Sequence, residues 1–564
     1  MLGCWLYHFL DEGTRGTGHD NHELKSEFYQ KVIKSNVLIF VNYDVDAICS
    51  TRILQYLLKC DNIEYTLIPV YDKDELIKSY QTYKDTFENI ILINCGGNID
   101  IVETFQPDEE TKFYILDNHR PLDIYNIYNE SQVCFLNQLE EEAPLPKYEE
   151  LFREDLDEVD DESDLTPEVL EKRREIREWI NKRHELLFAY QQFSYHGTPS
   201  SMIMFDLAWK MSRDNNELLW CAIIGLTDLY FHSKLDFVSY MSEVSKLQPH
   251  VVRHNQRLEN SEVTVNSLKI SYEKELRLFL YRHWTLMESL RHSIYTKCQL
   301  RLWSVKGDKK LKELLAEIGV PLSQAKQRFT SMELTYRSNI KSWLEDISEK
   351  YNLSEMLFAS FNSQFGYKIN LNAVDHTIIL STLLETSLKG VRFDQRFWDA
   401  LDALSHLNEG ALRKGMKHAF KRMTAIFSQI QVILDRKLIV SAGPFLYTVI
   451  QEGTPDLQYF SFPISLALLA HFLLQIYVSR SASQKLNHLP LVLAAPFEDS
   501  DHLLVVGVPP IAEESFRNFF GKAFEQVAQQ ANCGLHQPFF DLCMVKLCKA
   551  DKSRFFDALI SLLS

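Results

Sequence analysis

The chain has 564 residues, 46% of them hydrophobic, so it can bury sizeable cores but exceeds the length of a single one, and about two to four domains are expected. Residues 140–164 hold 13 acidic and 2 basic residues and thus supply −11 of the net charge of −17, so this charge does not exclude a basic surface elsewhere. Ten cysteines without a CxxC pair argue against a disulfide framework or a zinc finger and favour a reducing compartment, the nucleus or cytosol.

Residues 1–22 are predicted to be an N-terminal extension. They lack the basic start and the apolar core of a signal peptide. The segment GTRGTG follows no predicted strand, so we favour a flexible extension over a phosphate-binding loop.

Four apolar runs recur at a spacing of about 25 residues, with helical patterns between the first three. The runs are VLIFV near residue 37, YTLIPV near 65, NIILIN near 89 and KFYILD near 112. This alternation of strands and helices predicts an α/β fold with a parallel sheet, and we assign it to a domain over residues 23–229.

Polar side chains follow three of these strands. Asp44 and Asp46 come after the first, Asn94 after the third and Asp117 after the fourth. Because the carboxyl ends of parallel strands share one edge, we expect these groups to meet in a crevice. Two carboxylates spaced D-x-D can bridge divalent cations, or Asp46 caps the helix that begins at Ala47 while Asp44 stays solvated.

The acidic stretch 140–164 has few apolar residues, so a disordered or partner-ordered loop is expected, either a solubilising tether or a lure for basic partners. Thr166 and Pro167 then begin a long charged helix, and Thr198 with Pro199 begins another. Residues 230–351 are expected to form a helical insert, and 352–440 connecting helices.

A second alternation predicts a smaller α/β domain over residues 441–564. The expected order is strand 445–450, helix 463–478, strands 489–497 and 502–510, helix 516–531, strand 540–548 and a last helix capped by Asp551. The apolar helix that Pro463 begins is short for a bilayer span and carries His471 and Gln475, so we expect it to be buried and predict no membrane anchor.

The motifs at the strand ends resemble the DHH phosphoesterase superfamily, which includes the RecJ exonucleases and type II pyrophosphatases. Longer motifs resemble the eukaryotic cell division cycle protein 45 family, DHH relatives built into the replicative helicase. Among these motifs are NYDVDAICSTRIL, ILINCGGNID, YHGTPSSMIMFDLAW, IIGLTDL, GPFLYTVIQEGTPD and FFDALISLLS. The likeness runs from about Glu23 to Ser564.

Position by position, the resemblance implies that Asp44, Asp46 and Asp228 match metal-ligating aspartates of active DHH members. Asp117 and His119 of the Asp-His-His motif are also present. These positions are therefore expected to form a vestigial site.

The chain departs from the active pattern at three positions. Asn94 stands where the bridging aspartate is expected, Asn118 at the first histidine of the Asp-His-His motif, and Phe40 where some members have another histidine. An amide cannot supply the negative charge that two cations need, so we expect no catalytic residue, no bound metal and no cofactor. The C-terminal domain also lacks the glycine and histidine loop of active nucleases and has VVGVPP in its place.

The resemblance implies a non-catalytic nuclear scaffold that joins the MCM ring and the GINS complex during initiation and elongation of replication, near replicative DNA polymerases and fork factors. Two alternatives remain open. One is a manganese-dependent DHH-type exonuclease or phosphodiesterase acting on single strands, and the other is a single-strand DNA binding module with a steep salt dependence.

Two places are candidates for contact with partners or single-stranded DNA. The segment 276–312 interleaves basic and aromatic residues, including Arg301, Lys309 and Lys310, as strand-binding surfaces do. At helical spacing the same residues also fit a packed core with a solvated basic face. The second candidate is the groove between the two α/β domains, with Arg120 beside it.

Overall fold

The computed structural model describes most of the chain. The described residues are 28–29, 36–136, 145–153, 167–259, 267–366, 369–386, 392–405, 408–481, 483–497, 501–512 and 517–564. The predicted extension 1–22, the cap residue Thr166 and two parts of the acidic stretch, up to 144 and from 154, lie outside them.

The first sheet is parallel throughout, with the strand order β2-β1-β3-β4-β6. Its strands are β1 Val37–Asn42, β2 Tyr65–Val70, β3 Asn89–Ile93, β4 Lys112–Leu116 and β6 Val133–Phe135. The four predicted strands are confirmed. The short β6 was missed because three residues leave no readable periodicity.

Both faces of this sheet are covered, which explains the uninterrupted apolar runs. Val37, Ile39 and Val41 point into a large core, and Leu38 and Phe40 into a second one on the opposite face. The connecting helices are α2 Val45–Cys60, α3 Lys73–Tyr83, α4 Ile101–Phe105 and α5 Ile124–Tyr128. Two further helices, α8 Ser200–Lys210 and α9 Asn216–Phe231, pack on α2.

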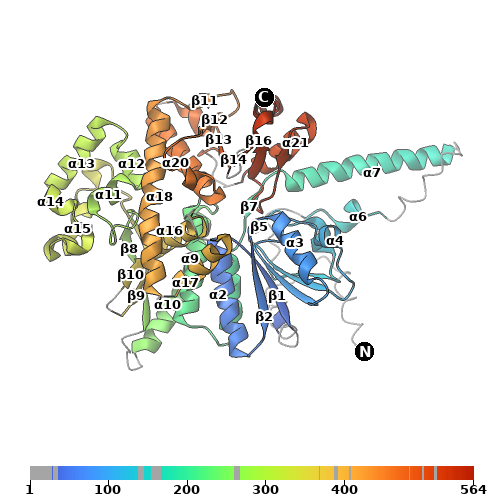
Figure 1. The fold of residues 1–564 in the computed structure, drawn as a ribbon, viewed down its shortest axis with the longest axis horizontal. Coiled ribbons are helices and arrows are strands. Elements are labelled where there is room, and N and C mark those ends of the chain that lie inside the picture. Colours follow the sequence, from blue (N-terminus) through green and yellow to red (C-terminus); the bar gives the residue numbers. More distant parts are fainter. Residues whose placement is uncertain are drawn as a thin grey trace.

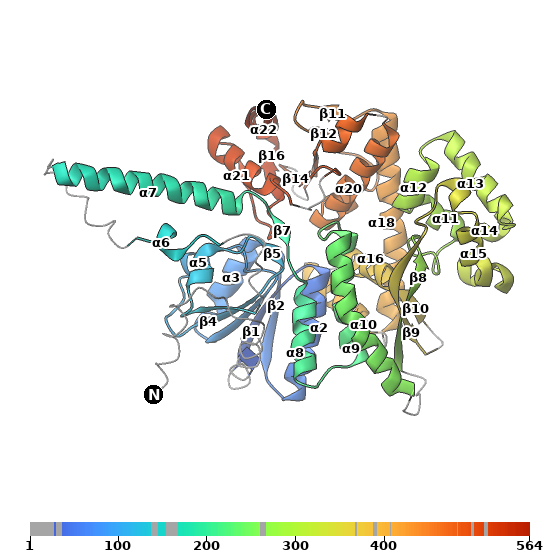
Figure 2. The same cartoon turned by 180° about the vertical axis from the view of Figure 1, so that it is seen from behind.

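A long helix, α7 Pro167–Gln191, projects from the body of the molecule (Figures 1 and 2). It begins at Pro167 as predicted. The described middle of the acidic stretch is not a simple loop, because Tyr148–Leu151 forms the short helix α6. There the ring of Tyr148 stacks on Phe152 at 4.7 Å.

The middle of the chain is mostly helical but also holds a small antiparallel sheet of order β10-β9-β8. The elements are α10 Phe237–Glu259, β8 Leu268–Leu276, α11 Leu286–Arg291, α12 Ile294–Leu300, α13 Val305–Glu317, α14 Leu322–Ala325, α15 Leu334–Asp346, β9 Leu357–Phe365, β10 Ile369–Asn372, α16 Ala373–Leu384, α17 Phe393–Ala403 and α18 Glu409–Asp435. Elements α11 to α15 share a core of their own and lie on the opposite side of the molecule from α7 (Figures 1 and 2). The three strands of this sheet were not predicted. Helix α16 packs on α9 and α2 in the large core, so part of this middle region shares a core with the first α/β unit. The domain boundaries given above stay predictions.

The C-terminal sheet has the order β11-β12-β13-β14-β16-β15. Its elements are β11 Val440–Ser441, β12 Leu446–Val449, α19 Leu457–Phe460, α20 Pro463–Arg480, β13 Leu491–Pro496, β14 His502–Val508, α21 Phe520–Ala531, β15 Leu535–His536, β16 Met544–Cys548 and α22 Lys552–Leu563. Helix α21 begins four residues later than predicted. The carboxylate of Asp551 stands at the start of α22 but accepts the N–H of Gly534 at 3.0 Å instead of capping the helix.

Helix α20 begins at Pro463 and packs against β13, β14, α12 and α18, as a core helix does. By length and composition it is long and apolar enough to cross a membrane, the one such helix in the described part of the chain. More than half of its residues are buried within the protein.

A loop of the C-terminal unit, residues 537–543, fastens that unit to the first sheet. Phe540 is buried among the side chains of β1, β3 and β4, and Asn98 Nδ2 donates to its carbonyl at 2.6 Å. The N–H of Lys73 donates to the carbonyl of Pro538 at 2.8 Å. The two α/β units are therefore joined beside the carboxyl ends of the first sheet.

Candidate functional site

The polar residues predicted to converge do lie together. Asp44 and Asp46 follow β1, Asn94 follows β3, Asp117 and Asn118 follow β4, and hydrogen bonds connect them. The crevice expected from the parallel topology is thus present, and it is nearly filled by its own side chains.

Asp44 is the cap of helix α2. Its Oδ1 accepts the N–H of Ala47 at 2.6 Å, and its Oδ2 accepts from Asn42 Nδ2 at 3.0 Å. Burial, followed by the nearby negative charge of Asp46, raises the pKa of Asp44 to about 7. The expectation that Asp46 caps this helix and Asp44 is solvated is wrong, because the helix begins at Val45 and Asp46 is fully buried.

Asp46 instead caps a helix from another part of the chain. Its carboxylate accepts the backbone N–H groups of Ser200 at 2.8 Å and of Ser201 at 3.0 Å, at the start of α8. Pro199, at the cap position of that helix, has no side chain acceptor to offer. A buried anion at a helix N-terminus is favourable because it meets unpaired N–H groups and the positive end of the helix dipole.

The two asparagines act as donors to the carboxylates. Asn94 Nδ2 lies 3.2 Å from oxygens of both Asp44 and Asp46, and Asn118 Nδ2 lies 2.8 Å from Asp46 Oδ2. The orientation of the Asn94 amide is fixed because its Oδ1 accepts from Ser200 Oγ at 2.5 Å and from the N–H of Asn118 at 3.3 Å. The N–H groups thus point at the oxygens that a divalent cation would need.

Asp117 is held by a separate set of bonds. Its Oδ2 accepts the N–H groups of Gly96 and Gly97 at 3.1 and 2.7 Å, and its Oδ1 lies 2.6 Å from Nδ1 of His119. Burial alone would raise the pKa of Asp117, but His119 and the amide donors outweigh it and hold that pKa below its usual range. A Cβ atom at Gly97 would lie 2.9 Å from that of Asp117, so this close approach requires glycine.

Asp228, on α9, faces the same region and pairs with Nδ1 of His232 at 3.0 Å. Beside Asp44 and Asp228 lies a cavity of about 80 Å³, closed on its other side by residues of the C-terminal unit such as Asp541. Pockets that take drug-sized ligands have volumes of roughly 300–1,000 Å³, so this groove has no room for a nucleotide.

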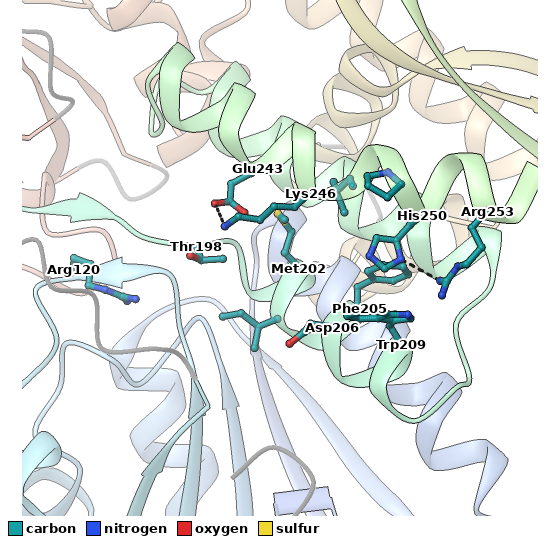
Figure 3. A pocket seen from close by; sticks show the side chains of 13 residues that line it. Arg120, Thr198, Met202, Phe205, Asp206, Trp209, Glu243, Lys246, His250 and Arg253 are labelled. Atoms are coloured by element: carbon teal, nitrogen blue, oxygen red, sulfur yellow. Dashed lines mark hydrogen bonds and ion pairs between the residues drawn. The ribbon is translucent and has the colours of Figure 1, made fainter. Parts of the chain in front are cut away.

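The structure places Arg120 away from that cavity. Its guanidinium is buried and Nη1 donates to the carbonyls of Asp117 and His119, both at 3.0 Å. It lines the end of another groove, between α8 and α10, with a volume of about 590 Å³ (Figure 3). Both apolar and charged side chains line that groove, and at its far end the rings of Trp209 and His250 meet edge to face at 5.0 Å.

The remaining predicted contact residues lie far out on the helical middle of the chain. Arg301, Lys309 and Lys310 are exposed at or near α13, where Lys309 pairs with Glu313 at 3.7 Å. They do not join the strand-end site. The described residues contain no group of three or more His, Cys, Asp and Glu side chains arranged to hold a metal ion.

Sequence reasoning missed Ser200 and Ser201 as partners of Asp46. The predicted helix start at Thr198 and Pro199 was a usable signal, since it leaves N–H groups in need of an acceptor. Lys234 and Asp541, which line the small cavity, were also missed, because no motif marks them.

Comparison with known proteins shows the family to which the chain belongs. The family model described as CDC45 matches residues 37–171 and 166–562. The chain belongs to the CDC45 family. Mouse cell division control protein 45 homolog is 42% identical over 562 residues, covering 96% of this chain and 99% of the mouse protein, and the human homolog is 41% identical over the same length.

The fold agrees with that assignment. The crystal structure of CDC45 from Entamoeba histolytica superposes with a TM-score of 0.70 at 20% identity and covers 96% of this chain and 99% of that one. The α/β architecture with a parallel sheet and helical regions is therefore the fold of a solved CDC45.

Proposed function

We propose that the chain is a non-catalytic scaffold subunit of the eukaryotic replicative DNA helicase. It joins the MCM ring and GINS in the nucleus and works beside replicative polymerases and fork factors. Membership of the CDC45 family supports a role in DNA replication. The sequence resemblance to inactivated DHH phosphoesterases supports the scaffold role.

One observation carries the non-catalytic part of the proposal. The amide groups of Asn94 and Asn118 donate to the carboxylates of Asp44 and Asp46, so the oxygens meant for cations are already occupied by N–H donors. A dinuclear site needs a bridging carboxylate and free lone pairs, and these residues do not fit that chemistry. No catalytic step is therefore derived from them.

The alternative is a manganese-dependent exonuclease or phosphodiesterase. We would measure turnover of a labelled single strand by the purified chain with Mn²⁺, beside an Asp44→Asn variant that keeps the helix cap. We expect no turnover in either protein. Turnover by the parent that Asp44→Asn abolishes would contradict the proposal and assign catalysis to this site.

Partner and DNA contact is tested on the exposed basic residues near α13. Reversing Arg301, Lys309 and Lys310 to glutamate should weaken assembly with MCM and GINS or binding of single-stranded DNA at low salt, since phosphate contacts depend on such charges. The matched control reverses three other exposed basic residues, Lys421 on α18 and Arg436 and Lys437 at its end. Assembly and DNA binding equal to those of the control would exclude α13 as a contact surface.

A further inference from the structure

Lys234 lies in the turn that follows helix α9. The turn begins at Ser233, which has a left-handed backbone with φ of 56°, and the N–H of Lys234 donates to the carbonyl of Leu229 at 2.8 Å. This path brings the lysine to the wall of the small cavity beside the strand-end site, and Asp44, Asp228 and Asp541 line the same cavity.

The groups around this cavity are mostly acidic or neutral. Asp44 and Asp228 come from the first α/β unit, Asp541 comes from the C-terminal unit, and Asp46 lies behind Asp44. Three histidines also line it, and two of them are kept neutral: burial, then Lys234 and other nearby cationic groups, lower the pKa of His196, while burial and His232 lower that of His471 to about 4. The third, His232, pairs with Asp228.

Among the described residues that line this cavity, Lys234 is the one lysine or arginine. Several carboxylates close together need a cation, and in a DHH-type enzyme divalent metals supply it.

We propose that the ammonium group of Lys234 is the resident cation of this site and stands in for the metal ions that its residues no longer fit. The inference rests on the proposed loss of the metal centre. A fixed positive charge among Asp44, Asp228 and Asp541 both neutralises them and repels an incoming divalent cation.

Because Asp541 belongs to the C-terminal unit, the same charge holds that unit over the crevice. Asp541 directly follows Phe540, which is buried in the core of the first sheet, and its Oδ1 accepts the N–H of Cys543 at 3.1 Å. The lysine therefore acts together with this loop to keep the groove closed.

A double-mutant cycle tests the proposal. The variants are Lys234→Met, Asp541→Asn and the pair, and folding equilibrium constants are measured by denaturant unfolding of the full chain. Asn keeps the acceptor for Cys543, so Asp541→Asn removes the charge alone. We expect Lys234→Met to lower the constant at least tenfold in the parent and less than threefold in the Asp541→Asn background.

The control is Lys246→Met, which removes an exposed lysine whose surface pair with Glu243 contributes little. If Lys234→Met does not fold, the double variant must restore folding, and Lys234→Arg must behave like the parent. Equal losses in both backgrounds, or a double variant that also fails to fold, overturn the proposal.

A second readout uses Mn²⁺ alone. Asn94 and Asn118 donate to Asp44 and Asp46 but not to Asp228 and Asp541. Without the lysine, Asp228 and Asp541 are open to a divalent cation, so millimolar Mn²⁺ should raise the unfolding midpoint of Lys234→Met and leave that of the parent unchanged. An equal rise in both proteins would show that Lys234 does not exclude the cation. Neither readout depends on turnover or on helicase assembly, so this inference can fail while the scaffold proposal stands.

Discussion

We predict that the carboxylate of Asp46 stabilises the fold in the absence of metal. In an empty metal site, by contrast, a carboxylate destabilises the fold. Two unpaired carboxylates repel each other when no cation is bound, so replacing one by an amide stabilises such a site. Here Asp46 accepts four N–H donors, from Asn94, Asn118, Ser200 and Ser201. Asp46→Asn is therefore expected to destabilise the fold.

The magnitude follows from the hydrogen bonds. An asparagine oxygen can keep the three donors that meet Oδ2, but its NH₂ group then faces the buried N–H of Ser201. A buried donor left unsatisfied costs about 1–3 kcal/mol, and changing charged bonds to neutral ones costs roughly 1 kcal/mol more. Lost repulsion with Asp44 offsets part of this, so we expect a net loss of about 2 kcal/mol, or about thirtyfold in the folding equilibrium.

Urea unfolding followed by circular dichroism, in buffer with a chelator, measures this change. The matched variant is Asp44→Asn, which retains a good helix cap and is expected to cost less than about 1 kcal/mol. The reasoning is refuted if the Asp46→Asn variant is at least as stable as the parent and Mn²⁺ also stabilises the parent. That result would indicate a metal-binding site.

Three further predictions concern close packing and burial in and beyond the site. Gly225→Ala would place a Cβ atom 2.0 Å from Oγ of Ser201, so we expect a loss of about 2–4 kcal/mol in the same unfolding assay, whereas a neutral effect would mean that α8 and α9 are loosely packed. Phe540→Ala removes a ring that is only 2% exposed and should cost about 3–5 kcal/mol, against less than about 1 kcal/mol for Phe188→Ala on α7, where the ring is 43% exposed; equal costs would mean that the 537–543 loop is not anchored. Burial raises the pKa of Asp375 to about 7, so the folded state holds a proton that the unfolded state releases above about pH 4, and stability should fall as pH rises from about 4 to 7 by at most roughly 1.4 kcal/mol per unit; an Asp375→Asn variant with an unchanged pH profile would contradict this.

The first sheet was readable from the sequence because its strands are buried on both faces and stand out as apolar runs. The strand β9, Leu357–Phe365, was missed because polar residues such as Asn362 and Ser363 interrupt it, yet these are buried and bonded to neighbouring side chains or backbone. Tertiary hydrogen bonding there overrides the local pattern.

The site was readable only in part for a similar reason. Convergence of the strand ends follows from parallel topology alone, so Asp44, Asn94 and Asp117 could be brought together in advance. The sequence did not show which carboxylate caps which helix. That pairing depends on the position of α8 relative to Asp46, and the two are some 150 residues apart in the chain. Lys234 lies in a turn that carries no sequence motif, and its proposed role follows only from the cavity that it lines together with Asp541.

The contacts of Asp44 and Asp46 give the D-x-D motif a structural role. Asp44 holds the start of α2, and Asp46 holds the start of α8, so each carboxylate now completes a helix that the fold needs. The amides of Asn94 and Asn118 donate hydrogen bonds to these carboxylates and so satisfy part of their hydrogen-bonding capacity from within the protein. An aspartate pair can therefore be required for stability whether or not it binds a metal, and its presence alone does not identify an active phosphoesterase.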